Sequence, residues 1–179
     1  MSFVKKLSVL LVLALLICSF CSCGEIKDNS HEPSNLGDVS WKGTLYSAQN
    51  GLFTLYFESG VDTVEGDVAD PYNLSVYCPE AYTAEIRYEG ARAKLDEAEA
   101  AIVATLSGYG IGSTDKDASI CGYDARYIPF SGEGIESAGV YFFNTARGFV
   151  QIYVLEVEGI SDAQHEHFTE VLSTLRIHD

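Results

Sequence analysis

Three cysteines lie close together near the start of the chain, within the stretch LLICSFCSCGEI. Cys18, Cys21 and Cys23 form a C-x-x-C-x-C pattern, and thiolates are side chains that zinc prefers. A structural zinc site needs a second ligand pair at a suitable spacing, and no such pair accompanies these cysteines. The spacing therefore does not favour a zinc site, and the residues that precede the cysteines offer another explanation.

The segment before the cysteines has the layout of an export signal. Lys5 and Lys6 supply a positive start, and residues 7–17 form an apolar run of about eleven residues. A membrane-spanning helix needs about 20 apolar residues, so this run is short for a span. We expect residues 1–22 to be a signal peptide, with a retained anchor that extends to Cys23 as the alternative.

The residues around Cys23 resemble a bacterial lipobox, in which the signal is cleaved before a cysteine that carries diacylglyceryl. Cys23 follows the small residue Ser22 and precedes Gly24, whereas bulky residues stand before the other two cysteines. Phe20 occupies the position where leucine is usual. The resemblance implies lipidation at Cys23 and attachment to the cell membrane on its extracytoplasmic side. Ordinary cleavage and release is the alternative.

The residues after Cys23 are polar and contain Pro33 and two glycines, with no apolar period up to residue 40. This composition is typical of a flexible linker. We expect residues 23–40 to be a lipidated tether and residues 41–179 to form a single folded domain. A chain with 47% hydrophobic residues and this length can bury a substantial core.

Several segments of the domain have the patterns of β-strands. The NG dipeptide at residues 50–51 stands between two apolar-rich runs and is the most favourable sequence for a tight hairpin. The stretch YTAEIRYEG places Ala84, Ile86 and Tyr88 on one face of a strand. Residues 149–157 are apolar on both faces, which predicts a central strand that is covered on both sides.

Two segments have the apolar spacing of helices. Asp96 and Glu99 form the pattern of a capping box at the start of the first, which Gly108 is expected to end. Ser161 and Gln164 are expected to cap the second. The order of strands, helix, strands and helix predicts an α+β fold in which an antiparallel β-sheet is covered by helices.

The same order of segments resembles the PsbP-like fold. The resemblance covers roughly residues 44–177 and is carried by NGLFTLYF, DEAEAAIVATL, GYDARYI, GVYFF, GFVQIYVLEVEG and HFTEVLSTLRI. This group includes photosystem accessory proteins, a Ran-binding nuclear import factor and many small bacterial lipoproteins. The resemblance implies an α/β/α sandwich and a non-enzymatic accessory or binding module. It carries over no functional residues.

Four histidines are available for acid–base chemistry. His31 lies in the expected tether and His178 at the end of the chain, which leaves His165 and His167. Two positions apart on a helix, their side chains point about 200° away from each other and cannot share a metal or form a dyad. We therefore expect both on a hydrated helix surface, and we expect no catalytic residue, no cofactor and no enzymatic activity.

Glu58, Asp62, Glu65, Asp67 and Asp70 form an acidic, loop-like segment. Carboxylate oxygens are the ligands that calcium prefers. The segment lacks the alternating aspartates and the glycine of a calcium hand, so a solvated loop is the simpler interpretation. A metal site formed by Asp62, Glu65, Asp67 and Asp70 is kept as a hypothesis.

Cys78 and Cys121 are the remaining cysteines, and both lie near the ends of expected strands. An exported chain tolerates a disulfide, so a bond between them is one hypothesis. The alternative is that each is a small buried apolar side chain.

Six of the eleven tyrosines fall on expected strands, and strand propensity accounts for most of them. An aromatic groove that binds a peptide or glycan is a further hypothesis for these rings. The six are Tyr77, Tyr88, Tyr123, Tyr127, Tyr141 and Tyr153.

The charge of the chain narrows its partners. With 11 basic and 26 acidic residues, the net charge is −15, and without residues 1–22 the balance is 9 basic against 26 acidic residues, or −17. Such a surface repels phosphate backbones, so we expect no nucleic-acid partner. We expect a membrane-anchored binding or assembly module that acts through a protein partner. A small-ligand or cation (calcium) binder is the alternative.

Overall fold

The structure is a computed structural model that describes residues 39, 41–48, 51–66 and 73–178. The expected signal peptide at residues 1–22, Cys23 and nearly all of the expected tether lie outside the described residues. Within the described residues, no helix is both long and apolar enough to cross a membrane. Apart from Val39, the described residues all lie within the range 41–179 that was expected to form the folded domain.

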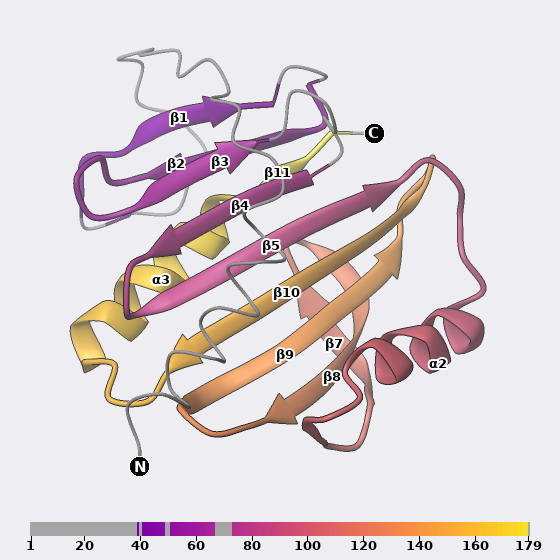
Figure 1. Ribbon diagram of the computed structural model, residues 1–179. Helices are drawn as coiled ribbons and strands as arrows, with labels where there is room; N and C mark the ends of the chain where they lie inside the picture. Colours follow the sequence, from indigo (N-terminus) through magenta and orange to yellow (C-terminus); the bar gives the residue numbers. More distant parts are fainter. Residues whose placement is uncertain (1–38, 40, 49–50, 67–72, 179) are drawn as a thin grey trace.

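An eight-stranded antiparallel sheet forms the body of the domain (Figure 1). β10 (Phe149–Val157) lies in the middle of this sheet and pairs with β5 (Tyr82–Glu89) and β9 (Ile135–Asn144). The prediction of a central strand at residues 149–157 is therefore confirmed. Along the sheet the strands are β3 (Thr63–Gly66), β4 (Asn73–Cys78), β5 (Tyr82–Glu89), β10 (Phe149–Val157), β9 (Ile135–Asn144), β8 (Tyr123–Ser131) and β6 (Gly110–Ile111), and β7 (Asp115–Ile120) pairs with β8.

The central place of β10 follows from its apolar residues, which alternate between two cores. Val150 and Ile152 belong to the core on one face of the sheet, and Phe149 and Leu155 belong to the core on the other face. All four are buried. When both faces of a strand are covered, apolar side chains are needed on both, and the sequence of the strand is then a nearly continuous apolar run.

A second, three-stranded sheet shares the first of these cores. It consists of β1 (Thr44–Ser47), β2 (Phe53–Phe57) and β11 (Arg176–Ile177), with β2 in the middle. β1 and β2 form an antiparallel hairpin in which Tyr46 pairs with Leu55. Gly51 adopts a φ of +70° in the turn between them, a conformation that glycine accepts without a steric penalty. The predicted hairpin is therefore confirmed.

One helix covers each face of the large sheet. α2 (Leu95–Thr105) contributes Ile102 to the core that contains Phe142. α3 (Asp162–Thr174) contributes Phe168 and Val171 to the core between the large and small sheets, and it lies behind β4 and β5 in Figure 1. The predicted fold class, an α+β fold with an antiparallel sheet covered by helices, is confirmed.

The starts of the two helices differ from each other in their capping. Ser161 accepts a hydrogen bond from the backbone of Gln164, and the Gln164 side chain bonds the Ser161 backbone, so the predicted capping box of α3 is confirmed. The capping box predicted at Asp96 is wrong, because α2 begins at Leu95 and its N-cap is Lys94, two residues before Asp96. Asp96 instead lies in the first turn and accepts a hydrogen bond from Arg126 on β8 at 2.7 Å.

Candidate ligand groove beside helix α3

The two histidines of α3 point to different sides of the helix, as their spacing predicts. His165 Nδ1 lies 2.6 Å from Glu156 Oε1 on β10, and His167 Nε2 lies 2.9 Å from Asp62 Oδ2. The expectation that both are hydrated surface residues is wrong for His167, whose side chain is only 12% exposed, whereas that of His165 is 61% exposed. Each imidazole therefore has its own carboxylate partner, and the two pairs are separate sites.

Asp62 is the centre of a buried polar cluster between α3 and the segment that joins β2 to β3. Its carboxylate accepts hydrogen bonds from the Tyr82 hydroxyl, from the backbone N–H of Glu58 at 2.8 Å and from His167. Burial raises the pKa of the Tyr82 hydroxyl, and the hydrogen bond to Asp62 raises it further. Because both carboxylate oxygens have donors, the cluster compensates the cost of burying this group and ties α3 to the β2–β3 connection.

The Asp62 cluster lacks the arrangement of a nucleophilic triad. In such a triad, one ring nitrogen of the histidine faces a carboxylate and the other faces a hydroxyl or thiol. Here Nε2 of His167 faces Asp62, and Nδ1 lies 3.9 Å from a carboxylate oxygen of Glu58. The hydroxyl in the cluster, that of Tyr82, bonds Asp62 rather than the imidazole. The hydrogen bonds of the cluster connect α3, β5 and the segment between β2 and β3.

The acidic segment that suggested a calcium site is only partly a loop. Glu65 lies on strand β3 and accepts a hydrogen bond from the Tyr77 hydroxyl at 2.9 Å. Asp62 already accepts the hydrogen bonds of the cluster, including that with His167. Among the described residues, no three metal-ligating side chains gather to hold an ion. Asp67 and Asp70, the other two members of the hypothesis, lie outside the described residues.

Cys78 and Cys121 are both free in the structure, so the hypothesis of a disulfide between them is not supported. Cys78 ends β4, whereas Cys121 follows β7, and β5, β10 and β9 lie between β4 and β8 in the sheet. Neighbouring strands are about 4.8 Å apart, and a disulfide joins Cα atoms about 6 Å apart. The alternative, that each is a small apolar side chain, fits their packing at the edge of the main core.

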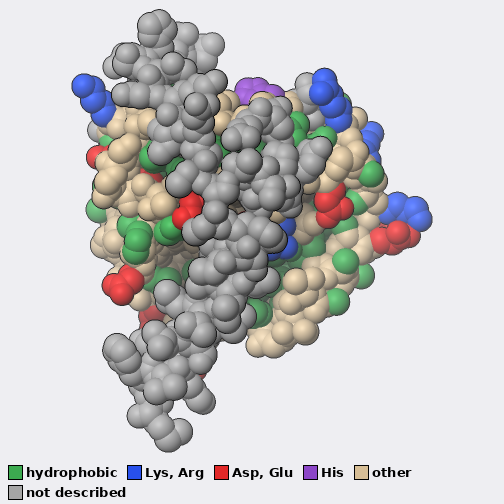
Figure 2. All heavy atoms as spheres, turned by 45° about the horizontal axis from the view of Figure 1, so that its top comes forward, with side chains coloured by type: hydrophobic (Ala, Val, Ile, Leu, Met, Phe, Trp, Pro, Cys, Tyr) green, Lys and Arg blue, Asp and Glu red, His purple; other side chains and the backbone are tan. Residues whose placement is uncertain are grey.

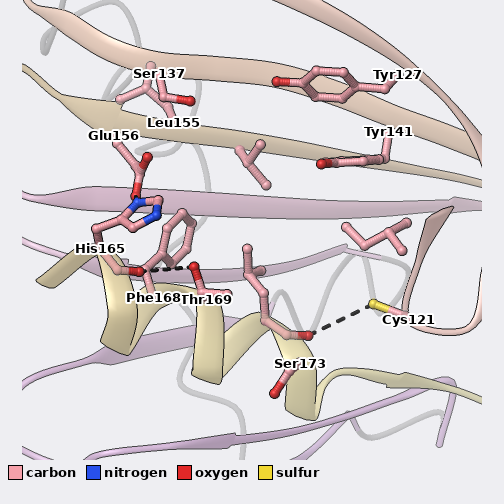
Figure 3. A pocket seen from close by; sticks show the side chains of 13 residues that line it. Cys121, Tyr127, Ser137, Tyr141, Leu155, Glu156, His165, Phe168, Thr169 and Ser173 are labelled. Atoms are coloured by element: carbon pink, nitrogen blue, oxygen red, sulfur yellow. Dashed lines mark hydrogen bonds and ion pairs between the residues drawn. The ribbon is translucent and has the colours of Figure 1, made fainter. Parts of the chain in front are cut away.

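A groove of about 310 Å³ lies between α3 and the strands β8, β9 and β10 (Figure 3). Tyr127 and Tyr141 form its wall on the sheet side, with ring centroids 4.4 Å apart. Phe168 and Leu172 form the wall on the helix side. Tyr127 and Tyr141 are paired across β8 and β9, and Phe168 and Leu172 lie four positions apart on α3, so each pair lies on one side of its element.

A glycine makes room for the tyrosine wall. Gly139 lies on β9 between the groove-facing positions 137 and 141, and it pairs with Pro129 of β8. A Cβ atom at Gly139 would collide with the ring of Tyr127, so the absence of a side chain lets that ring lie over β9. The Tyr127 hydroxyl then donates to the carbonyl of Ala138 at 3.3 Å.

The two ends of the groove differ in their chemistry. Glu156 and His165 form one end, and Cys121 lies at the other (Figure 3). The Glu156 side chain is only 9% exposed, and among the described residues no lysine or arginine lines the groove. Burial raises the pKa of the Cys121 thiol to about 11, so this end is uncharged near neutral pH. The groove thus has an apolar, aromatic body with a negative charge at one end.

The turn that carries Cys121 has the geometry of a two-residue hairpin. Cys121 and Gly122 have φ values of 54° and 82°, and the flanking residues Ile120 and Tyr123 pair across the turn. Such turns favour residues that tolerate positive φ at both central positions. The turn fixes Cys121 at the end of β7, where its thiol donates to the carbonyl of Leu172 at 3.9 Å.

The hypothesis of an aromatic groove formed by all six strand tyrosines is wrong. Only Tyr127 and Tyr141 line the groove. Tyr123 stacks on Phe143, and the ring of Tyr153 lies under the guanidinium of Arg87, 4.8 Å from it. Tyr77 and Tyr88 likewise lie outside the groove lining.

Sequence reasoning missed both the Asp62 cluster and the Glu156 end of the groove. Asp62 and His167 lie 105 positions apart, so no local spacing links them. Glu156 is a charged residue within an apolar strand, and that irregularity was the one available signal. It marked a carboxylate that must be buried beside a partner.

Comparisons with known proteins find likeness at the level of the fold. No family model matches the chain, and no curated protein matches it. A cyanobacterial PsbP from Synechocystis is 10% identical, with a TM-score of 0.48 over 83% of this chain and 99% of that chain. A protein from Bacteroides thetaiotaomicron is 15% identical, with a TM-score of 0.46 over 78% of this chain. This chain spans 50% of the length of the Bacteroides protein. One of these two structural neighbours is a PsbP protein.

Proposed function

We propose that the protein is a non-catalytic binding module whose binding site is the groove beside α3. The groove itself is the observation that carries this proposal. Its volume of about 310 Å³ lies at the lower end of the range for ligand sites. Its lining of aromatic and aliphatic walls with few polar groups is also typical of such sites.

The absence of an activated nucleophile in the groove supports a binding role. Cys121 is the strongest nucleophile by type, but its raised pKa of about 11 keeps the thiol protonated near neutral pH. His165, the histidine of the groove, bonds Glu156 and lies at the opposite end from Cys121 (Figure 3). A thiol without a nearby base is a poor catalyst of acyl or group transfer.

We further propose that the module is held at the extracytoplasmic side of the cell membrane through lipid on Cys23. The lipobox-like residues around Cys23 and the polar character of the tether support this anchor. Replacing Cys23 with serine removes the lipid acceptor, so we expect C23S to be released or to stay unprocessed. Membrane fractionation measures this, and unchanged attachment of C23S would indicate a retained helix instead.

The binding role is tested by filling the groove. Thr169 lies on the exposed side of α3 and lines the groove, so Thr169→Trp should block it at little cost in stability. Glu166→Trp places the same ring at an exposed position of α3 that does not line the groove. The full chain is used as bait in its own cell envelope. We expect its captured partner or ligand to be lost with T169W and kept with E166W.

A protein partner and a free small molecule give different results in that experiment. Protein capture that depends on the open groove supports an assembly role. A small molecule that co-purifies with the wild type and not with T169W supports ligand binding, which the small volume of the groove favours. Capture that is unaffected by T169W contradicts the groove as the binding site.

A further inference from the structure

We propose that the groove binds a small aromatic amine, with its ammonium group at Glu156 and its ring between the tyrosine wall and Phe168. This inference rests on the proposed function of the groove as a binding site. It names the class of ligand: a primary amine joined by a short linker to one aromatic ring.

The carboxylate of Glu156 is the first reason for this ligand class. Its side chain is 9% exposed, and its Oε1 lies 2.6 Å from Nδ1 of His165, whose side chain is 61% exposed. An exposed imidazole on a helix surface can move aside at little cost, and an ammonium group can take its place. A charge-assisted hydrogen bond in a partly dry site is stronger than one between neutral groups.

The aromatic walls are the second reason. Tyr127 and Tyr141 present a pair of rings on the sheet side, and Phe168 presents another on the helix side. Aromatic rings prefer offset-stacked or edge-to-face contacts with one another, which a planar ligand ring can make here. Burial raises the pKa of the Tyr127 and Tyr141 hydroxyls, so both remain protonated and uncharged near neutral pH.

The overall charge is the third reason. The chain has 26 acidic and 11 basic residues, and in the part of the chain that the structure describes no lysine or arginine lines the groove. Where visible in Figure 2, the Lys and Arg side chains are scattered and form no patch. The field of the molecule therefore attracts cations and repels anions. An aromatic acid of the same shape would meet like charge at Glu156.

The size of the groove limits the ligand. A volume of about 310 Å³ is close to the minimum for a ligand site and leaves room for one ring and a short chain. Phenethylamine has this size and carries the amine two carbons from its ring. Phenethyl alcohol and 3-phenylpropionate share its body with a neutral or a negative head, so the three compounds isolate the effect of charge.

The test measures binding of these three probes by isothermal titration calorimetry to the full chain in lipid nanodiscs, with empty nanodiscs subtracted. We expect phenethylamine to bind about tenfold more tightly than phenethyl alcohol, and 3-phenylpropionate to bind most weakly. In the Glu156→Gln variant, phenethylamine and phenethyl alcohol should bind with about equal affinity. The affinity for the alcohol should change much less than that for the amine, because a neutral hydroxyl can also hydrogen-bond a side-chain amide.

A second variant guards against misfolding of E156Q. His165→Arg substitutes an exposed residue and places a permanent cation beside Glu156, so it should weaken amine binding about tenfold and alcohol binding much less. Equal affinities of the wild type for amine and alcohol would overturn the amine inference while the groove remains a binding site. Failure of all three probes would also overturn it. The capture experiment with T169W then decides the proposed function separately.

Discussion

A single buried carboxylate, that of Asp62, joins three parts of the chain. Its oxygens accept from Tyr82 on β5, from His167 on α3 and from the backbone of Glu58 after β2. Each donor would lose its acceptor in the interior if the carboxylate were removed. An unsatisfied buried donor costs far more than a typical hydrogen bond contributes.

Replacing Asp62 with alanine should therefore destabilise the protein by about 2–4 kcal/mol. The reason is that the Tyr82 hydroxyl and the His167 ring stay buried without an acceptor. Denaturant unfolding followed by circular dichroism measures the change. Asp124→Ala removes an exposed aspartate as the control and should stay within about 0.5 kcal/mol of the wild type. Equal stability of the two variants would contradict this role of Asp62.

The thiol of Cys121 gives a prediction about pH. Because burial raises its pKa to about 11, the reactive thiolate is scarce near neutral pH. Alkylation of native Cys121 by iodoacetamide should be slow at pH 8 and should accelerate up to about pH 11. Peptide mass spectrometry measures the rate at Cys121.

The same pKa shift has a consequence for stability. The folded-state pKa exceeds that of the unfolded thiol, so the contribution of Cys121 is complete below about pH 9 and is lost as pH rises through 11.

In denaturant without reductant, Cys78 and Cys121 should both be alkylated. A disulfide between them would leave both unmodified under these conditions.

At the scale of elements, α2 is held to the sheet by an ionic contact as well as by its apolar side. Arg126 on β8 donates to Asp96 at 2.7 Å and to Glu99 at 2.9 Å, and both acceptors lie on α2. The hydrogen bond and the charge of Arg126 lower the pKa of Asp96. A lowered pKa means that this contribution is present above about pH 4 and is lost as pH falls further.

Arg126→Ala should therefore increase the local opening of α2 and lower the free energy of unfolding of the whole domain only slightly. We expect a loss of about 1 kcal/mol, because partly exposed ion pairs contribute little, and faster hydrogen exchange of the α2 amides. Hydrogen exchange read by mass spectrometry measures the change. Arg92→Ala changes an exposed arginine before α2 and should leave the exchange of α2 as it is. The same acceleration in both variants would show that the pair with Asp96 and Glu99 does not hold the helix.

The shape of the groove depends on β9 accepting the ring of Tyr127. Gly139→Ala adds a methyl group at the place of that ring, which must then move. We expect a loss of about 1–3 kcal/mol, as for other small-to-large changes at packed sites, and a displaced Tyr127. Thermal unfolding and a crystal structure of the variant measure both effects. Gly90→Ala adds a methyl group where nothing lies within 4 Å and should be nearly neutral.

The elements that could be predicted from the sequence are those set by local patterns. The run of apolar residues in β10, the hairpin at Gly51 and the capping box at Ser161 all follow from neighbouring residues. The capping box at Asp96 was wrong because α2 begins at Leu95, and the Asp96 carboxylate accepts a hydrogen bond from Arg126 instead. The local pattern of Asp96 and Glu99 cannot reveal a partner 30 positions away.

The candidate site was less predictable than the fold for the same reason. The groove combines residues of β8, β9, β10 and α3, and it exists only once these elements pack. Its carboxylate, Glu156, reaches His165 across a turn, and its tyrosine wall depends on Gly139 of the neighbouring strand. The spacing of apolar residues and their strand or helix propensity predict the face of an element on which each residue lies. They do not predict which faces of different elements pack against each other.

At the scale of the whole molecule, the excess of acidic over basic residues is the dominant feature. A net charge of −15 favours solubility and disfavours the compact state through self-repulsion. Salt has two opposite effects on such a protein. It screens the repulsion, which raises stability, and it weakens exposed ion pairs such as that of Lys94 with Glu97, which lowers it.

We expect the repulsion to dominate, because 26 acidic residues face only 11 basic ones and exposed pairs contribute little. Raising sodium chloride from about 20 to 300 mM should shorten the Debye length from roughly 20 to 6 Å and raise Tm by a few degrees. A variant with Asp124, Glu133 and Glu166 changed to lysine, all exposed positions, should respond less because its net charge is smaller. Differential scanning calorimetry of both chains measures the responses. A Tm that falls with salt in the wild type would mean that ion pairs outweigh the net charge, and the attraction of cations to the groove would then have to arise from Glu156 alone.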